Sequence, residues 1–178
     1  MSSYKVLKNQ IFFNNGYSIV PLRYEDRMSI LKWRNEQVYH LRQDKPLSKL
    51  DQENYFSSVV NKLFEQEQPR QLLFSFLQGK NCIGYGGLVH INWIDKNAEI
   101  SFVMETKLEK EYFELYWVTF LNLLEKIAFK ELFFNKIYTH AFDLRPHLYP
   151  ILEKQNFVKE NQYTDTNGNK VVIHSKHK

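Results

Sequence analysis

Apolar residues follow first a strand period and then a helical period in the N-terminal part of the chain. Residues 17–22, "YSIVPL", predict a strand, and their serine and proline indicate an edge position in a sheet. Residues 25–35, "EDRMSILKWRN", carry apolar side chains at helical spacing, and residues 44–48 predict a loop. A second helix is expected after Ser48, which suits an N-cap with Asp51 in the first turn.

The middle of the chain predicts an antiparallel meander followed by a long helix. Residues 71–92 predict two strands joined at Gly79-Lys80-Asn81, and residues 98–104 predict a third strand after a polar turn. Residues 107–129, "KLEKEYFELYWVTFLNLLEKIAF", are amphipathic, with aromatic and aliphatic side chains recurring on one helix face. We expect that face to pack on the sheet.

The last part of the chain predicts a strand at 136–142, a short helix at 145–155 and a hairpin that turns at Asn167-Gly168. We find no internal repeat and no linker, so we expect one domain over residues 1–178, with residues 1–15 as an N-terminal extension. The fold class is α/β (α+β), with a mixed, mostly antiparallel sheet of about seven strands and about four helices.

The composition is that of an ordinary soluble globular protein, with 43% hydrophobic and 25% charged residues. The net charge of +4 comes from scattered lysines and arginines, which gives a mild preference for anionic partners and does not indicate a nucleic-acid surface. Cys82 is the only cysteine, and apolar stretches stay below the roughly 20 residues that cross a bilayer. We expect a cytoplasmic protein without metal, nucleic-acid partner or membrane insertion, and we leave a homodimer open.

The start of the 107–129 helix is acidic and bulky. Thr106 and Glu109 have the spacing of a capping box, in which Thr106 caps the helix and Glu109 returns to the Thr106 amide. Glu111 and Glu114 add negative charge at the same end. Each carboxylate would repel a bound anion by about 1 kcal/mol or more at 4 to 6 Å. We therefore expect this helix start to be closed by the protein itself.

The order of elements resembles the GNAT fold of acyl-CoA-dependent N-acetyltransferases over essentially the whole chain. The resemblance is carried by "CIGYGGLVHINWIDKNAEISFVM", by "NKIYTHAF" and by "LEKQNFV", where the family often has Tyr-Glu-Lys-x-Gly-Phe. The segment "LKWRN", residues 31–35, is similar to the branch that contains ribosomal-protein and amino-sugar nucleotide acetyltransferases. The resemblance implies an N-acyltransferase with acetyl-CoA as its donor.

In that family, acetyl-CoA lies in a V between the fourth and fifth strands, and its pyrophosphate caps the following helix. The loop there usually reads Arg/Gln-x-x-Gly-x-Gly/Ala. Counting back from Phe129 places this motif on residues 112–117, where neither small residue is present. Either the loop is rebuilt and binds CoA through side chains, or the CoA site is lost or altered. The cofactor-binding residues that the resemblance implies are Phe102, Val103, Met104, Lys110 and Arg145.

Arg145 matches the place of a helix-start asparagine that touches the cofactor in relatives. An arginine there can supply the anion contact that the loop lacks. Alternatively, Asp143 simply caps this helix, with Pro146 in its first turn.

Amine acetylation needs a base for the ammonium and sometimes an acid for the departing thiolate. Glu99 lies where relatives carry a working carboxylate, although it can equally be a solvated charge at a strand end. His90 and His140 can each serve as a base near neutral pH, although a lone strand histidine is more often structural. The family's thiolate-protonating tyrosine falls on Leu152, so we name Tyr149, about one helical turn earlier, as its substitute. We assign Glu99, His140 and Tyr149 to catalysis and His90 to the acceptor side.

Trp33, Arg34 and Asn35 lie near the acceptor by resemblance, with Trp33 suited to stacking and Arg34 to a phosphate, or Trp33 only anchors its helix. The leading hypothesis is an N-acyltransferase acting on a primary amine, such as that of a nucleotide-linked amino sugar for cell-surface polysaccharide. A protein N-terminal acetyltransferase is a second enzyme hypothesis. From another class, the alternative is a non-catalytic GNAT-like binding module that has lost the usual CoA pyrophosphate site.

Overall fold

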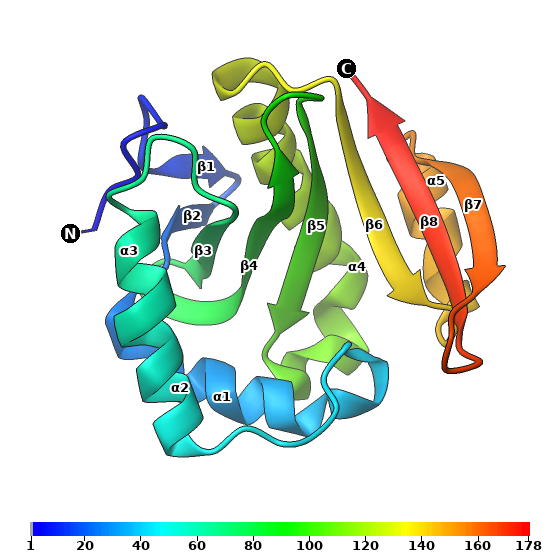
Figure 1. Ribbon diagram of the computed structural model, residues 1–178, viewed down its shortest axis with the longest axis horizontal. Coiled ribbons are helices and arrows are strands. Elements are labelled where there is room, and N and C mark those ends of the chain that lie inside the picture. The colour runs from blue at the N-terminus through cyan, green and yellow to red at the C-terminus, as the bar shows by residue number, and fades with distance from the viewer. Residues whose placement is uncertain (1) are drawn as a thin grey trace.

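Helices cover both faces of one eight-stranded sheet in the computed structural model, which describes residues 2–178 (Figure 1). The strands lie in the order β1-β2-β3-β4-β5-β6-β8-β7, and every neighbouring pair is antiparallel except β5 and β6. The expected mixed, mostly antiparallel α/β domain is therefore confirmed. The strands are β1 (Phe12–Asn14), β2 (Tyr17–Pro21), β3 (Leu72–Gln78), β4 (Asn81–Asn92), β5 (Asn97–Met104), β6 (Lys136–Phe142), β7 (Val158–Thr164) and β8 (Lys170–His177).

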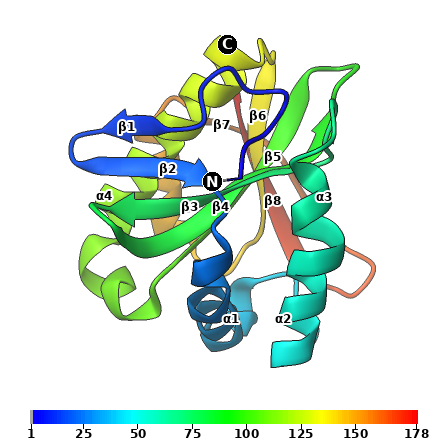
Figure 2. The same ribbon diagram turned by 90° about the vertical axis from the view of Figure 1, so that its left-hand side faces the viewer.

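The helices divide between the two faces of the sheet. Figure 2 shows α4 on one side of the strands and α2 and α3 on the other. No helix within residues 2–178 is both long and apolar enough to span a bilayer. The helices are η1 (Tyr24–Asp26), α1 (Arg27–Glu36), η2 (Val38–His40), α2 (Lys49–Tyr55), η3 (Phe56–Val60), α3 (Asn61–Leu63), α4 (Thr106–Glu125), η4 (Lys126–Glu131), η5 (Pro146–Leu148) and α5 (Tyr149–Lys154), of which η3 and η4 are π-helical.

The described N-terminal residues, which we expect to form an extension, pack on the core of the domain. Tyr4 is 1% exposed, and its hydroxyl donates to the Leu73 carbonyl oxygen at 2.7 Å. β1 pairs with β2 from Asn14↔Tyr17 to Phe12↔Ile19, so β2 is not an edge strand. β1 is also the eighth strand where we expected about seven, because three residues are too few to show a strand period.

The long helix is held on the sheet by aromatic packing. α4 begins at Thr106 and continues through π-helical η4 to Glu131, which confirms the predicted helix at 107–129. The ring of Phe120 is fully buried, and its centroid lies 5.5 Å from that of Phe76 and 4.6 Å from that of Phe102. Each such buried ring contributes about 1.5–3 kcal/mol by removing apolar surface from water. This packing holds the C-terminal half of α4 against β3 and β5.

The two parallel strands part from each other halfway along. β5 and β6 pair only at Asn97↔Lys136, Ala98↔Ile137 and Glu99↔Tyr138, whereas β5 runs on to Met104 and β6 to Phe142. The gap between them at their carboxyl ends is visible in Figure 1. Glu99 therefore lies at the apex of a V in the middle of the sheet.

Candidate active site

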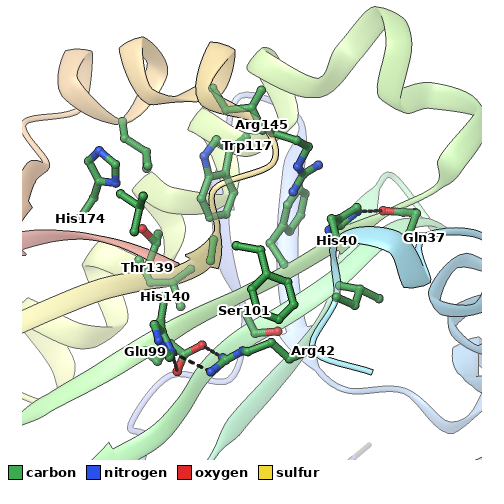
Figure 3. Close-up of a pocket in the computed structure, with 18 of the residues that line it drawn as sticks. Gln37, His40, Arg42, Glu99, Ser101, Trp117, Thr139, His140, Arg145 and His174 are labelled. Carbon is green, nitrogen blue, oxygen red and sulfur yellow. Dashed lines mark hydrogen bonds and ion pairs between the residues drawn. The ribbon is translucent and has the colours of Figure 1, made fainter. Parts of the chain in front are cut away.

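A cavity of about 470 Å³ opens where β5 and β6 part (Figure 3). Side chains of a strand alternate between its faces, and Phe102 stacks on Trp117 of α4, so Glu99 points to the face opposite α4. We call this side the front arm, and its lining includes Arg34, Arg42, His90, Glu99 and His140. We call the α4 side the rear arm, and its lining includes Phe102, Trp117, Thr139, Tyr149, Leu152 and His174.

Glu99 is the carboxylate of the front arm. It is 3% exposed, accepts a hydrogen bond from Arg42 Nη2, and has Oε2 3.2 Å from Nδ1 of His90. Burial raises the pKa of Glu99 above its usual range, and Arg42 and His90 offset part of that rise. The interpretation of Glu99 as a solvated strand-end charge is therefore wrong. A buried carboxylate with a raised pKa is suited to taking a proton near neutral pH.

His140 lies in the same network with its lone pair already engaged. Its Nδ1 lies 2.7 Å from Arg42 Nη1, and because arginine can only donate, Nδ1 is the acceptor. Nε2 therefore carries the proton and donates to the Tyr163 hydroxyl at 2.8 Å. Burial, with Arg42 and His90, lowers the pKa of His140, so the ring is neutral at pH 7. His140 can act as a base only when Arg42 moves away from it.

His90 reaches Glu99 from a distorted part of β4. The register between β4 and β5 shifts between Val89 and Asn92, and His90 has a left-handed φ of 49°. A non-glycine residue in that region is uncommon and typical of bulges and functional sites. The side chain of His90 is 65% exposed, so it lies at the open edge of the front arm. The assignment of His90 to the acceptor side stays a prediction.

Arg42 is the central residue of the front arm, and no sequence pattern predicts it. It lies in the irregular segment between η2 and α2. Asn35 holds that segment, because its Nδ2 donates to the Leu47 carbonyl oxygen and its Oδ1 accepts from the Leu47 amide, both at 2.8 Å. Arg34 Nε donates to Gln43 Oε1 at 2.9 Å. These contacts form only in the fold, so no local pattern marks Arg42.

The three residues predicted for the acceptor side have different environments. Trp33 is 4% exposed within the core, so the expectation that it stacks on a ligand is wrong and its role is to anchor α1. Arg34 lines the front arm, and its Nη1 donates to the Tyr85 hydroxyl at 2.8 Å. Asn35 holds the segment that carries Arg42.

Tyr149 lines the rear arm, but its hydroxyl is occupied. It donates to Asp143 Oδ1 at 2.5 Å, and the Tyr149 ring centroid lies 4.7 Å from that of the buried His174. Burial and the neighbouring carboxylate raise the pKa of Tyr149. A phenol whose hydroxyl already donates a hydrogen bond to Asp143, and whose pKa is raised, is a poor acid for a thiolate, which counts against the predicted role. Asp143 does not cap the following helix either, because the N-cap position of η5 is Arg145.

The start of α4 is not closed by a capping box, so that prediction is wrong. The Thr106 hydroxyl donates to Glu36 Oε2 at 2.5 Å and accepts from Gln37 Nε2 at 3.1 Å. Glu109 instead accepts from Arg145 Nη1 at 3.0 Å. Within residues 2–178, no side chain caps the N-terminus of α4. The Leu108 amide donates to the Glu105 carbonyl oxygen at 3.0 Å, so the amides of Thr106 and Lys107 are the ones available to a ligand.

The positions at which the family motif has small residues lie inside α4 and not at its start. Residues 112–117 are helical, because α4 already begins at Thr106. The Arg145 guanidinium carbon lies 5.6 Å from the centroid of the Phe113 ring, at the rim of the cavity. Of the other predicted cofactor contacts, Phe102 and Met104 line the cavity, Val103 is 3% exposed in the core, and Lys110 is exposed outside the cavity lining.

The described lining of the cavity carries more positive than negative side chains, and one of its arginines, Arg145, is paired with Glu109 outside the lining. Its described lining contains three arginines and one carboxylate, which are Arg34, Arg42, Arg145 and Glu99. His40 lies beside Gln37, with its Nε2 3.2 Å from Gln37 Oε1, and burial and Arg145 lower its pKa to about 4 (Figure 3). The histidine is neutral at pH 7, so the positive charge comes from the arginines.

Comparison with known proteins identifies one matching family and many similar folds. The sequence model of a family described as "Acetyltransferase (GNAT) domain" matches residues 19–147. A spermidine N-acetyltransferase from Vibrio cholerae, solved in complex with CoA and spermine, is 19% identical with a TM-score of 0.78, over 92% of this chain and 96% of that chain. A dodecameric structure of spermidine N-acetyltransferase from the same organism, in an intermediate state, is 20% identical with a TM-score of 0.70, over 92% and 95% of the two chains. No curated protein matches the sequence.

Proposed function

Since the chain belongs to the GNAT family of acetyltransferases, we propose that it acetylates the primary amine of a small anionic acceptor and that Glu99 takes the proton from that amine. The observation that carries this proposal is the position of Glu99, which is buried at the apex of the V with a raised pKa. The same apex is where the two arms of the cavity meet. A donor in the rear arm and an acceptor in the front arm would therefore meet beside this carboxylate.

The residues present fit acetyl-CoA, which as a thioester supplies the acetyl group. The gap between β5 and β6 opens onto the rear arm, whose side chains Phe102, Trp117 and Leu152 offer apolar surface. At the rim, the uncapped first turn of α4 and the Arg145 guanidinium offer donors to an anion. We assign the pyrophosphate to these groups, with Lys110 close by in the same helix. The glycines absent from residues 112–117 are not needed for this arrangement, because those residues lie within the helix.

The front arm carries out the proton transfer. Glu99 can accept a proton only in its charged form. Burial disfavours that form, and Arg42 and His90 offset part of this effect. The raised pKa brings Glu99 closer to neutral pH, where a carboxylate is a more effective base. His140, neutral and held by Tyr163, is the second group that can accept a proton once Arg42 leaves Nδ1.

The positive charge of the cavity favours an anionic acceptor. The similar structures are of an enzyme whose substrate, spermidine, is a polycation, but a polycation would meet three arginines here. A phosphate or carboxylate on the acceptor would be bound by these side chains. A nucleotide-linked amino sugar has both a diphosphate and a primary amine, and we keep it as the acceptor class.

The test is an assay of acetyl-CoA-dependent acetylation, in which release of the CoA thiol is measured. We expect a nucleoside diphosphate-linked amino sugar to be acetylated with a higher kcat/KM than spermidine. Turnover of spermidine alone would contradict the anionic acceptor. Binding of acetyl-CoA without acetylation of any amine would instead favour the non-catalytic binding module.

A further inference from the structure

The Arg42 guanidinium occupies the position beside Glu99 that the proposed function gives to the acceptor ammonium. One of its terminal nitrogens donates to Glu99 Oε1 and the other lies 2.7 Å from His140 Nδ1. Glu99 and His140 are therefore bound to the same cation. The Glu99 side chain is 4% exposed and the Arg42 side chain is 39% exposed, so Arg42 covers the carboxylate from the solvent side.

An ammonium cannot simply be added to this arrangement. To lose a proton to Glu99, the acceptor nitrogen must come within hydrogen-bond distance of a carboxylate oxygen. That position places a second positive charge beside Arg42 in a site that is mostly shielded from water, where like charges repel strongly. Either Arg42 leaves without a partner, or it finds another anion.

We propose that Arg42 is a specificity-determining residue that exchanges partners when the acceptor binds, an inference that rests on the function proposed above. The acceptor ammonium takes the place of Arg42 at Glu99, and Arg42 binds an anionic group on the same acceptor, close to the amine. Release of Arg42 also frees Nδ1 of His140. The acceptor class is an amine with a neighbouring phosphate or carboxylate.

The segment that carries Arg42 suits this exchange. Its fixed points are Leu47, held by Asn35, and Gln43, held by Arg34. Among residues 2–178, the hydrogen bonds of Arg42 to other side chains all come from its guanidinium. The side chain can therefore swing while the segment stays in place. Arg34 lines the same arm and adds positive charge there for the anionic group of the acceptor. Its Nη1 and Nε donate to Tyr85 and Gln43, so these contacts hold its side chain in place.

Three small amines that share an aminoethyl group test the exchange. Ethanolamine is neutral beyond its amine, O-phosphoethanolamine carries a phosphate and β-alanine carries a carboxylate. Acetylation by the wild-type protein should have a kcat/KM at least about tenfold higher for one of the anionic amines than for ethanolamine, mainly through KM. Which anionic amine gains identifies the phosphate or the carboxylate as the group recognised.

The variant Arg42→Gln should reduce this advantage to within about twofold, because glutamine keeps a polar side chain but no charge. The matched control is Arg27→Gln, which removes an arginine paired with Glu53 at 2.7 Å, outside the cavity lining. This control should keep the full advantage. An advantage that survives Arg42→Gln, or a wild-type preference for ethanolamine, would overturn the exchange.

A second measurement on the wild-type protein does not depend on turnover. The side-chain Nε–H signal of Arg42, assigned by its loss in Arg42→Gln, should shift on addition of O-phosphoethanolamine or β-alanine and not on addition of ethanolamine. An unmoved signal would overturn the exchange even where acetylation is observed. If the signal shifts but no amine is acetylated with acetyl-CoA, the exchange stands and the proposed function fails.

Discussion

In the front arm the polar side chains bind one another, whereas in the rear arm the Tyr149 hydroxyl binds a residue outside the cavity lining. Arg42 links Glu99 on β5 to His140 on β6, so all three side chains lie within one network. In the rear arm, the Tyr149 hydroxyl donates a hydrogen bond to Asp143, which does not line the cavity. The function we propose therefore assigns proton transfer to the front arm, while the rear arm offers mainly shape and apolar surface. Changes in the two arms should therefore affect different kinetic constants.

The largest effect is expected from Glu99→Gln in the front arm. Loss of a general base typically lowers the rate by 10² to 10⁴-fold, so kcat should fall by about that factor. The KM for acetyl-CoA should stay within about twofold, because Glu99 does not lie in the rear arm. The measurement is release of the CoA thiol, with Glu160→Gln on exposed β7 as a control that keeps full activity. If Glu99→Gln retains more than a third of the wild-type kcat, the base lies elsewhere.

The next effect concerns the rim of the rear arm. If Arg145 binds the donor pyrophosphate, Arg145→Ala should weaken acetyl-CoA binding by roughly 1.5–3 kcal/mol, or about 10- to 150-fold in Kd. The kcat at saturating acetyl-CoA should change little. Calorimetric titration of acetyl-CoA measures the effect directly.

The partner of Arg145 provides the matched control. Glu109 accepts from Arg145 at 3.0 Å, so Glu109→Gln removes a negative charge from the first turn of α4 and frees the guanidinium. We expect this variant to bind acetyl-CoA more tightly than the wild type. If both variants weaken binding equally, the pair has only a structural role and the pyrophosphate does not lie at this rim.

A residue of either arm can be predicted from the sequence when it lies within a regular helix or strand. Glu99, His140 and the long helix lie within regular elements, whose periods are visible in the sequence, and β6 was predicted at its observed bounds. Ser48 is also predicted as an N-cap with Asp51 in the first turn, and the structure shows this pair as a capping box. The Thr106–Glu109 pair has the same spacing, yet tertiary partners, Gln37 and Arg145, take both side chains away from the helix start.

Arg42 could not be predicted for the opposite reason. It lies in an irregular segment, and its position depends on Asn35, on Gln43 and on strands that follow much later in the chain. Trp33 shows that sequence-based prediction is also limited for core residues, because a tryptophan on an amphipathic helix suits both stacking on a ligand and burial. Only the packing around α1 decides that it is buried.

A smaller effect, on pH dependence, separates the two arginines of the front arm. Arg42 lowers the pKa of Glu99, which burial raises, so Arg42→Gln should raise that pKa further. Glu99 has to be deprotonated to act as a base, so kcat/KM increases as the pH rises through its pKa. The acidic limb of the profile should therefore move to higher pH in Arg42→Gln. Arg34→Gln, which loses contacts to Tyr85 and Gln43 only, should leave the limb in place, and a limb that moves equally in both variants would contradict a direct effect on Glu99.

The smallest effect is expected from Tyr149→Phe in the rear arm, where the family resemblance pointed to an acid. The hydroxyl already donates to Asp143, and burial raises its pKa, so it has little tendency to give a proton to a thiolate. The variant should keep kcat within about threefold, and it should lose about 0.5–1.5 kcal/mol of the free energy of unfolding, the usual contribution of one hydrogen bond. Asp143 keeps a contact from Gln162 Nε2 at 3.4 Å, so it is not left wholly unpaired. The two readouts are the rate of CoA release and a denaturant titration. A loss of kcat of more than tenfold without loss of stability would restore Tyr149 as the acid and place proton transfer in both arms.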